Sequence, residues 1–182
     1  GKTTLIRTLL ERPDLERTAV IINEFGEIGL DHELIESSEE DLVELSTGCI
    51  CCVMRGDLQE AIERLMVRQQ TGKVFDRIIL ETTGLADPGP ILHSLIYNEY
   101  LKSLVRLDRV VITVDALSGL NSISNFKECP QQIALADIIL ITKADIDSTN
   151  VDDLRRELRR INPEAFIYKS NFGMTEVDLF SL

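Results

Sequence analysis

The chain has 182 residues, and its 19 basic and 31 acidic side chains give a formal net charge of −12. Most of so acidic a surface would repel a nucleic-acid backbone. No run of about 18 apolar residues exists that could span a membrane. Four cysteines are too few for a disulfide scaffold, and Cys-x-Cys-Cys spacing disfavours disulfides. We therefore expect a reducing, cytoplasmic setting in which the thiols serve metal or redox chemistry.

Helical and strand-like patterns alternate along the chain. Helical periods are predicted at 2–11, 55–71 and 150–161, and a further helix is expected to begin at the Asp87-Pro88 pair. Continuous apolar, β-branched runs predict strands at 19–23, 77–82, 109–115, 137–142 and 165–168. This alternation predicts one α/β domain over residues 1–182, a three-layer sandwich with a mostly parallel sheet and helices on both faces.

The chain opens with "GKTTLIRTLL", in which Gly-Lys-Thr precedes a helical pattern. This order is typical of the end of a G-x-x-x-x-G-K-[ST] phosphate loop. In such a loop Lys2 pairs with the β- and γ-phosphates and Thr3 binds Mg²⁺. Gly1 and Thr4 are expected to contact the nucleotide as well. The preceding strand and loop glycine are not in the chain. We therefore expect a P-loop NTPase fold without its first strand, with weak nucleotide binding and slow, impaired hydrolysis.

Three cysteines, Cys49, Cys51 and Cys52, fall within four positions, which we expect to form one turn. A closed structural zinc site needs four ligands, so three thiolates make an incomplete cage from which a metal can be passed on. Soft thiolates suit Zn²⁺, and Co²⁺ accepts the same tetrahedral geometry. A fourth ligand could come from Glu24 or His32. A packed turn of small residues and a redox pair are the alternatives for this cluster.

Residues 77–84, "RIILETTG", predict a buried strand that ends in an acid, with a glycine three residues later. A carboxylate at Glu81 can hold the water shell of Mg²⁺. The backbone N–H of Gly84 can contact the terminal phosphate and sense its loss. These two residues support the phosphate-loop interpretation of the opening motif.

Residues 137–145, "DIILITKAD", predict a strand that ends in a motif resembling the Asn-Lys-x-Asp signature of GTPases. The carboxylate of Asp145 can accept hydrogen bonds from N1–H and the 2-amino group of guanine, which adenine does not offer. The stem of Lys143 can lie over the base. Thr142 stands where GTPases usually place Asn, so we expect GTP to bind with reduced affinity.

Four stretches together, "VIINEFGEIGLDHELI", "ELSTGCICCVMRGDL", "ILETTGLADPGPIL" and "QIALADIILITKAD", resemble the CobW family of metal-linked P-loop GTPases. The resemblance runs from Gly1 to about Asn171, and the family's Gly-Cys-x-Cys-Cys signature is linked to Zn²⁺ or Co²⁺ handling. It implies that "NEFGEIGLD" is the first switch and favours Glu24 over His32 as a metal ligand. The family's C-terminal domain is expected to be absent here.

The hydrolytic residue is not evident, and Glu27 and Asp31 in the switch are the candidates. These observations predict a GTP-hydrolysing metallochaperone domain. GTP and Mg²⁺ would order the switch, the switch would complete the thiolate site, and hydrolysis would loosen it. The metal would pass to a client metalloenzyme or a metal-cofactor pathway protein, and a homodimer is left open. An ATP-using or redox-thiol P-loop enzyme, and a metal buffer or scaffold without turnover, are the alternatives.

Overall fold

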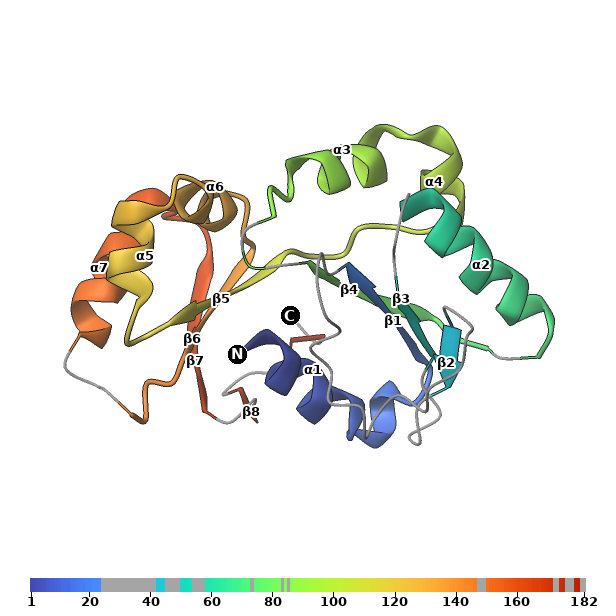
Figure 1. The fold of residues 1–182 in the computed structure, drawn as a ribbon, viewed down its shortest axis with the longest axis horizontal. Helices are drawn as coiled ribbons and strands as arrows, with labels where there is room; N and C mark the ends of the chain where they lie inside the picture. The colour runs from blue at the N-terminus through green and yellow to red at the C-terminus, as the bar shows by residue number, and fades with distance from the viewer. Residues whose placement is uncertain are drawn as a thin grey trace. The chain divides into compact units, whose positions relative to one another are not determined.

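The structure is a computed structural model that describes residues 1–23, 42–44, 50–53, 58–72, 74–82, 84, 86–146, 150–171, 174–175 and 179–180. The chain separates into two compact units, one made of Gly1–Leu5 with Leu85–Leu182 and the other of Ile6–Gly84. Each unit contains a four-stranded sheet, labelled in Figure 1. The expected α/β class with mainly parallel strands is confirmed, and the strands are divided between two sheets.

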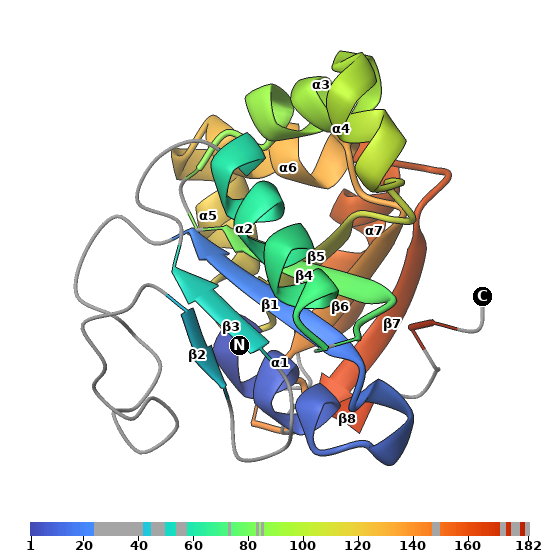
Figure 2. The ribbon, with the colours of Figure 1, turned by 90° about the vertical axis from the view of Figure 1, so that its right-hand side faces the viewer.

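The β1–β4 unit, Ile6–Gly84, has the strand order β2-β3-β1-β4, which Figure 2 shows side by side. The strands are β1 (Thr18–Asn23), β2 (Leu42–Glu44), β3 (Ile50–Val53) and β4 (Arg77–Thr82). β1 pairs in parallel with β3 and β4, whereas β2 is an antiparallel edge strand on β3. β1 is a central strand, and its apolar residues 19–22 are almost completely buried, as is typical of parallel sheets.

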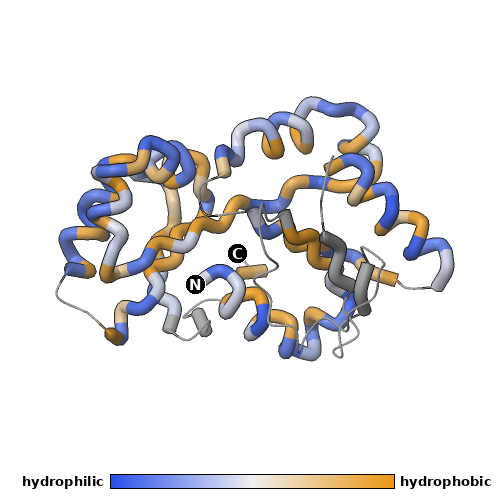
Figure 3. The backbone as a smooth tube through the Cα atoms, in the orientation of Figure 1, coloured by the Kyte–Doolittle hydropathy of each residue, from blue (hydrophilic) through white to orange (hydrophobic). Residues whose placement is uncertain are grey.

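Helix α2 (Leu58–Gln70) lies against β3 in this unit. Its buried residues recur at the three- and four-residue spacing of one helical face: Leu58, Ala61, Ile62 and Leu65. Helix α1 (Lys2–Leu10) begins in the other unit and continues into this one, where the short 3₁₀ helix η1 (Pro13–Leu15) follows it. Figure 3 shows that hydrophobic residues follow the strands while hydrophilic residues are frequent on α2.

The β5–β8 unit, Gly1–Leu5 with Leu85–Leu182, has the strand order β5-β6-β7-β8. Its strands are β5 (Val111–Asp115), β6 (Ile138–Thr142), β7 (Phe166–Asn171) and β8 (Met174–Thr175). Its helices are α3 (Gly89–Tyr97), α4 (Glu99–Leu104), α5 (Gly119–Asn125), α6 (Glu128–Ala134) and α7 (Val151–Ile161). β5, β6 and β7 are parallel, and β8 is antiparallel to β7.

Helices α5, α6 and α7 cover one face of the β5–β8 sheet (Figure 1). The core between them includes Ile139 and Ile141 from β6 and Leu154 and Leu158 from α7, all completely buried. Every residue of β6 is buried, as is typical of a central strand in a parallel sheet. The carboxyl end of β6 is therefore held on a rigid element.

Several local expectations differ from the structure. Cys51 and Cys52 lie on β3, not in a turn, because the pairing of this short segment with β1 makes it a strand. The N-cap residue of α3 is Pro88, whereas the sequence predicted Asp87 at that position. The side chain of Asp87 still reaches the start of the helix, where its Oδ1 accepts from the N–H of Gly89 at 2.8 Å. β7 continues through Asn171, three residues beyond the strand expected at 165–168.

None of the helices in the described part of the chain is long and apolar enough to cross a lipid bilayer.

Candidate functional site

The carboxyl end of β6 holds the residues predicted to recognise a base. Thr142 is the last residue of β6 and is 7% exposed. Its hydroxyl donates to the carbonyl oxygen of Val114 at 3.4 Å, and its own carbonyl accepts from the N–H of Ala116 at 2.9 Å. Both hydrogen bonds are made with β5 or the residue after it. Thr142, which stands where GTPases usually place Asn, therefore connects β6 to the neighbouring strand through its side chain and its backbone.

The backbone reverses directly after β6. Lys143 has a φ of 58°, in the left-handed region that a non-glycine residue enters at a cost of roughly 1–2 kcal/mol. The turn is closed by the N–H of Ile146, which donates to the carbonyl of Lys143 at 3.1 Å. This conformation buries Ala144 and leaves Asp145 exposed. The carboxylate of Asp145 is therefore presented at the sheet edge where ligands of open α/β sheets bind.

Lys143 is held by a carboxylate that the sequence analysis did not single out. Its Nζ lies 2.5 Å from Oδ2 of Asp115, the last residue of β5. The other oxygen, Oδ1, accepts from the N–H of Leu117 at 2.8 Å. Burial alone would raise the pKa of Asp115, but the hydrogen bonds from Lys143 and Leu117, with the charge of Lys143, lower it overall. The carboxylate is thus ionised at neutral pH.

A pattern in the sequence could have indicated Asp115. It ends the apolar run "RVVITVD" just as Glu81 ends "RIILET", and an acid at the carboxyl end of a buried parallel strand lies at the ligand-binding edge. Only the register of the sheet, however, shows that Asp115 lies opposite Thr142 and one position from Lys143.

The residues predicted to bind phosphate and Mg²⁺ lie at the expected ends of their elements. Lys2, Thr3 and Thr4 form the first turn of α1, the end of a helix that favours anions. Glu81 lies near the carboxyl end of β4, and Gly84 follows in an exposed turn. The hydroxyl of Thr3 and the carboxylate of Glu81 are oxygen donors of the kind that suits Mg²⁺. They belong to different units, so their sharing of one ion stays a prediction.

The predicted transition-metal ligands are only partly covered by the structure. Cys51 and Cys52 lie on β3, opposite Val20 and Ile21 of β1. The others lie outside the described residues: Cys49, Glu24, the alternative ligand His32, and the candidate hydrolytic residues Glu27 and Asp31. Within the described ranges, no three His, Cys, Asp or Glu residues gather closely enough to hold a metal ion.

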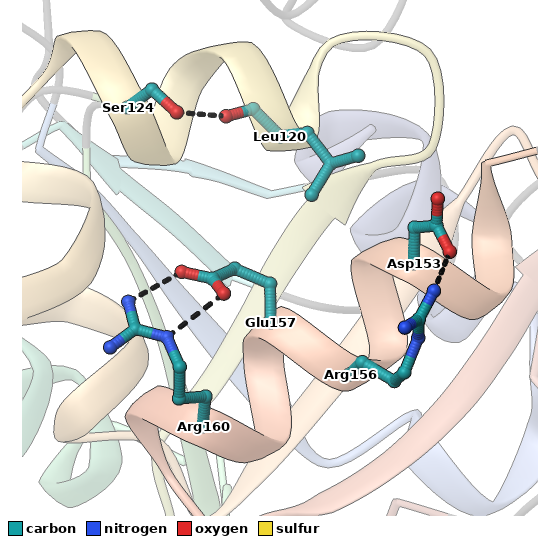
Figure 4. Close-up of a pocket in the computed structure, with 6 residues that line it drawn as sticks. All are labelled: Leu120, Ser124, Asp153, Arg156, Glu157 and Arg160. Atoms are coloured by element: carbon teal, nitrogen blue, oxygen red, sulfur yellow. Dashed lines mark hydrogen bonds and ion pairs between the residues drawn. The ribbon is translucent and has the colours of Figure 1, made fainter.

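A shallow hollow of about 520 Å³ lies between α5 and α7 in the β5–β8 unit (Figure 4). Its charged side chains pair with each other on α7, Arg156 with Asp153 and Arg160 with Glu157. Two acids and two arginines leave the hollow without net charge. It offers no uncompensated group for an anionic nucleotide or a cation.

Comparison with known proteins places these features in context. A family described as "CobW/HypB/UreG, nucleotide-binding domain" matches residues 1–169. The zinc chaperone YjiA of Escherichia coli (strain K12) is 37% identical over 98% of this chain and 56% of its own length. The zinc-regulated GTPase metalloprotein activator 1 of Schizosaccharomyces pombe is 35% identical over 95% of this chain and 43% of its own. The chain thus spans about half the length of these relatives.

Solved structures agree with this similarity. The Zn(II)-bound YjiA GTPase of E. coli superposes with a TM-score of 0.77 at 36% identity, covering 98% of this chain and 56% of the other. HypB from Helicobacter pylori in complex with nickel gives a TM-score of 0.65 at 18% identity, covering 96% and 74%, which shows the shared fold alone.

Proposed function

Because the chain belongs to the CobW/HypB/UreG family through its nucleotide-binding domain, we propose that the protein binds and hydrolyses GTP with Mg²⁺ and couples this cycle to Zn²⁺ or Co²⁺ binding. The metal would pass to a client metalloenzyme or a metal-cofactor pathway protein. Relatives named as a zinc chaperone and a zinc-regulated GTPase support the proposal, although each is longer than this chain.

The observation that best supports nucleotide binding is the turn that follows β6. Thr142 is anchored to β5, Lys143 is fixed by an ion pair, and Asp145 is exposed beside them. A carboxylate has two acceptor oxygens, which match the adjacent N1–H and 2-amino donors of guanine. Adenine lacks that donor pair, so a site built in this way selects guanine.

Replacing Asp145 by alanine in the full-length protein tests this assignment. A site that depends on hydrogen bonds can discriminate by a factor on the order of 10⁴ against a base that does not satisfy them. We expect Asp145→Ala to lose most of the preference for GDP over ADP while phosphate-dependent affinity largely persists. Calorimetric titrations with GDP, IDP and ADP measure this, and IDP isolates the contribution of the 2-amino group. An unchanged preference would rule out the assignment of Asp145.

The register of the β1–β4 sheet supports the proposed transition-metal site. Cys51 and Cys52 are on β3, and β3 pairs with β1, whose carboxyl end leads directly to Glu24. Cys52 lies opposite Ile21, three residues before Glu24, and three extended residues span roughly 10 Å at most. The two cysteines therefore pair with the strand after which the switch segment begins along the chain, which supports coupling between metal and nucleotide. Cys49 and Glu24 complete the proposed ligand set.

Metal titrations of cysteine variants test this site. A structural zinc ion in a zinc finger contributes about 10–16 kcal/mol over four ligands, so one ligand is worth roughly 3 kcal/mol, or about 100-fold in affinity. We expect Cys51→Ser and Cys52→Ser each to cause a loss of this order and to weaken the thiolate charge-transfer absorption of the Co²⁺ complex. Cys129→Ser is the matched control, because Cys129 belongs to α6 and packs against the core, where burial raises its pKa.

The titration needs a competitive chelator and a defined nucleotide state. A variant of the E. coli relative in which one glutamate and two adjacent cysteines are replaced by alanine is itself Zn(II)-bound, so total zinc content does not report on this motif. We expect Glu24→Ala to weaken high-affinity binding mainly with a GTP analogue present. Equal metal affinities with GTP analogue, with GDP and without nucleotide would disprove the coupling, since linkage between two ligands is reciprocal.

A further inference from the structure

An ion pair joins the last residue of β5 to the residue that follows β6. Asp115 ends β5 opposite Thr142 on β6, and Lys143 follows Thr142. The carboxylate of Asp115 is itself fixed, because one oxygen accepts from the N–H of Leu117 at 2.8 Å while the other lies 2.5 Å from Nζ of Lys143. The carboxylate of Asp115 therefore connects the backbone of the turn after β5 to the side chain of Lys143, the first residue of the turn after β6.

Stability alone is a weak explanation for this contact. The Lys143 side chain is 45% exposed and that of Asp115 is 26% exposed, and ion pairs with this much solvent contact usually add little to folding. Among the non-glycine residues that the structure describes, Lys143 alone has a positive φ, 58°. Its backbone and its ammonium group are thus both constrained, which leaves the aliphatic stem between them little freedom.

We propose that Asp115 is a positioning residue of the nucleotide site, whose carboxylate holds the Lys143 side chain in the direction that places its stem along the base bound by Asp145. This inference rests on the guanine site proposed above. Its physical basis is preorganisation. Fixing a lysine side chain before the nucleotide arrives removes an ordering cost that binding would otherwise carry. Asp115 does not itself need to contact the nucleotide.

The test uses the full-length protein and four variants: Asp115→Asn, Lys143→Met, the two combined, and Asp108→Asn. Asp115→Asn removes the charge but keeps an oxygen that can accept from Leu117. Lys143→Met keeps an unbranched stem without the ammonium group. Asp108→Asn is the matched control, because it removes one carboxylate that pairs with Arg109 before the amino end of β5, in the same unit. Dissociation constants for GDP, IDP and ADP are measured by calorimetry, with melting temperatures alongside.

We expect Asp115→Asn to weaken GDP binding by about three- to tenfold, the range for releasing one flexible side chain. Lys143→Met should weaken binding at least as much, and the double variant should be no weaker than Lys143→Met. This non-additivity shows that Asp115 acts through Lys143, which a purely structural role would not produce. The GDP/IDP ratio should stay as in the wild type, because Asp145 reads the 2-amino group.

Three outcomes would overturn the inference. The GDP affinity of Asp115→Asn could equal that of Asp108→Asn, the losses of the two single variants could add, or Asp115→Asn could bind GDP more tightly than the wild type. The last result would mean that the ion pair holds Lys143 away from the nucleotide. Failure of the guanine site itself gives a different result, a wild type that binds GDP and ADP equally.

Discussion

Asn162, which follows α7, is a buried polar side chain whose loss should destabilise the β5–β8 unit. It is 8% exposed, and its amide donates to the carbonyls of Ile133 at 2.8 Å and Ala136 at 2.9 Å. Its Oδ1 accepts from the N–H of Ala165 at 3.0 Å. A single buried carboxamide thus joins the end of α6 to the chain that enters β7.

Besides two longer, part-buried hydrogen bonds, to the carbonyl of Ala134 at 3.4 Å and from the N–H of Glu164 at 3.2 Å, replacing Asn162 by alanine removes the three shorter, buried ones. Each is worth about 1 kcal/mol net, so we expect a loss of about 3–4 kcal/mol in the free energy of unfolding, including part of the desolvation cost of the groups left behind. In a chain of this size that lowers the melting temperature by about 6–16 °C.

Urea unfolding followed by far-ultraviolet circular dichroism measures this loss as a lower midpoint with an unchanged slope. Asn125→Ala is the matched control, because Asn125 also donates from its amide, at 2.9 Å to the carbonyl of Asn121, but on the exposed side of α5. We expect this control to change stability by less than about 0.5 kcal/mol. If Asn162→Ala also cost less than about 1 kcal/mol, the three buried hydrogen bonds would not hold α6, α7 and β7 together as reasoned here.

Two further predictions concern β5, which ends at Asp115, and helix α5, which begins at Gly119. In Gly119→Ala the new Cβ would lie 2.7 Å from Cγ1 of Val114 and 3.1 Å from Cδ1 of Leu154, so overpacking should cost about 1–3 kcal/mol despite the better helix propensity of alanine; an unchanged melting temperature would contradict this. Although burial opposes it, hydrogen bonding lowers the pKa of Asp115 below its ordinary value of 3.8 in the folded protein. Its contribution to stability is therefore present above that pH and is lost as the pH falls through the lowered value, so the melting temperatures of wild type and Asp115→Asn should converge in acid and differ at pH 7.

Much of the fold, and the choice of residues for the proposed nucleotide site, follows from local patterns in the sequence. β1, β4, β5, β6 and β7 are apolar, β-branched runs, and α2 and α7 have apolar residues at helical spacing, so their positions were predictable within a few residues. Short motifs that each follow or open such an element predict four of the proposed site residues, Lys2, Thr3, Glu81 and Asp145. These signals are local because burial on both faces of a parallel strand, or on one face of a helix, determines the residue types directly.

The tertiary structure decided the features that depend on pairing between distant segments. β3 is only four residues long and contains Cys51 and Cys52, and it becomes a strand because it pairs with β1 from about thirty residues earlier in the chain. The contact of Asp115 with Lys143 likewise depends on the register between β5 and β6, which no spacing along the sequence specifies. Residue type and periodicity record what each segment must bury, whereas the partner that a buried or charged group meets is determined only when the strands align.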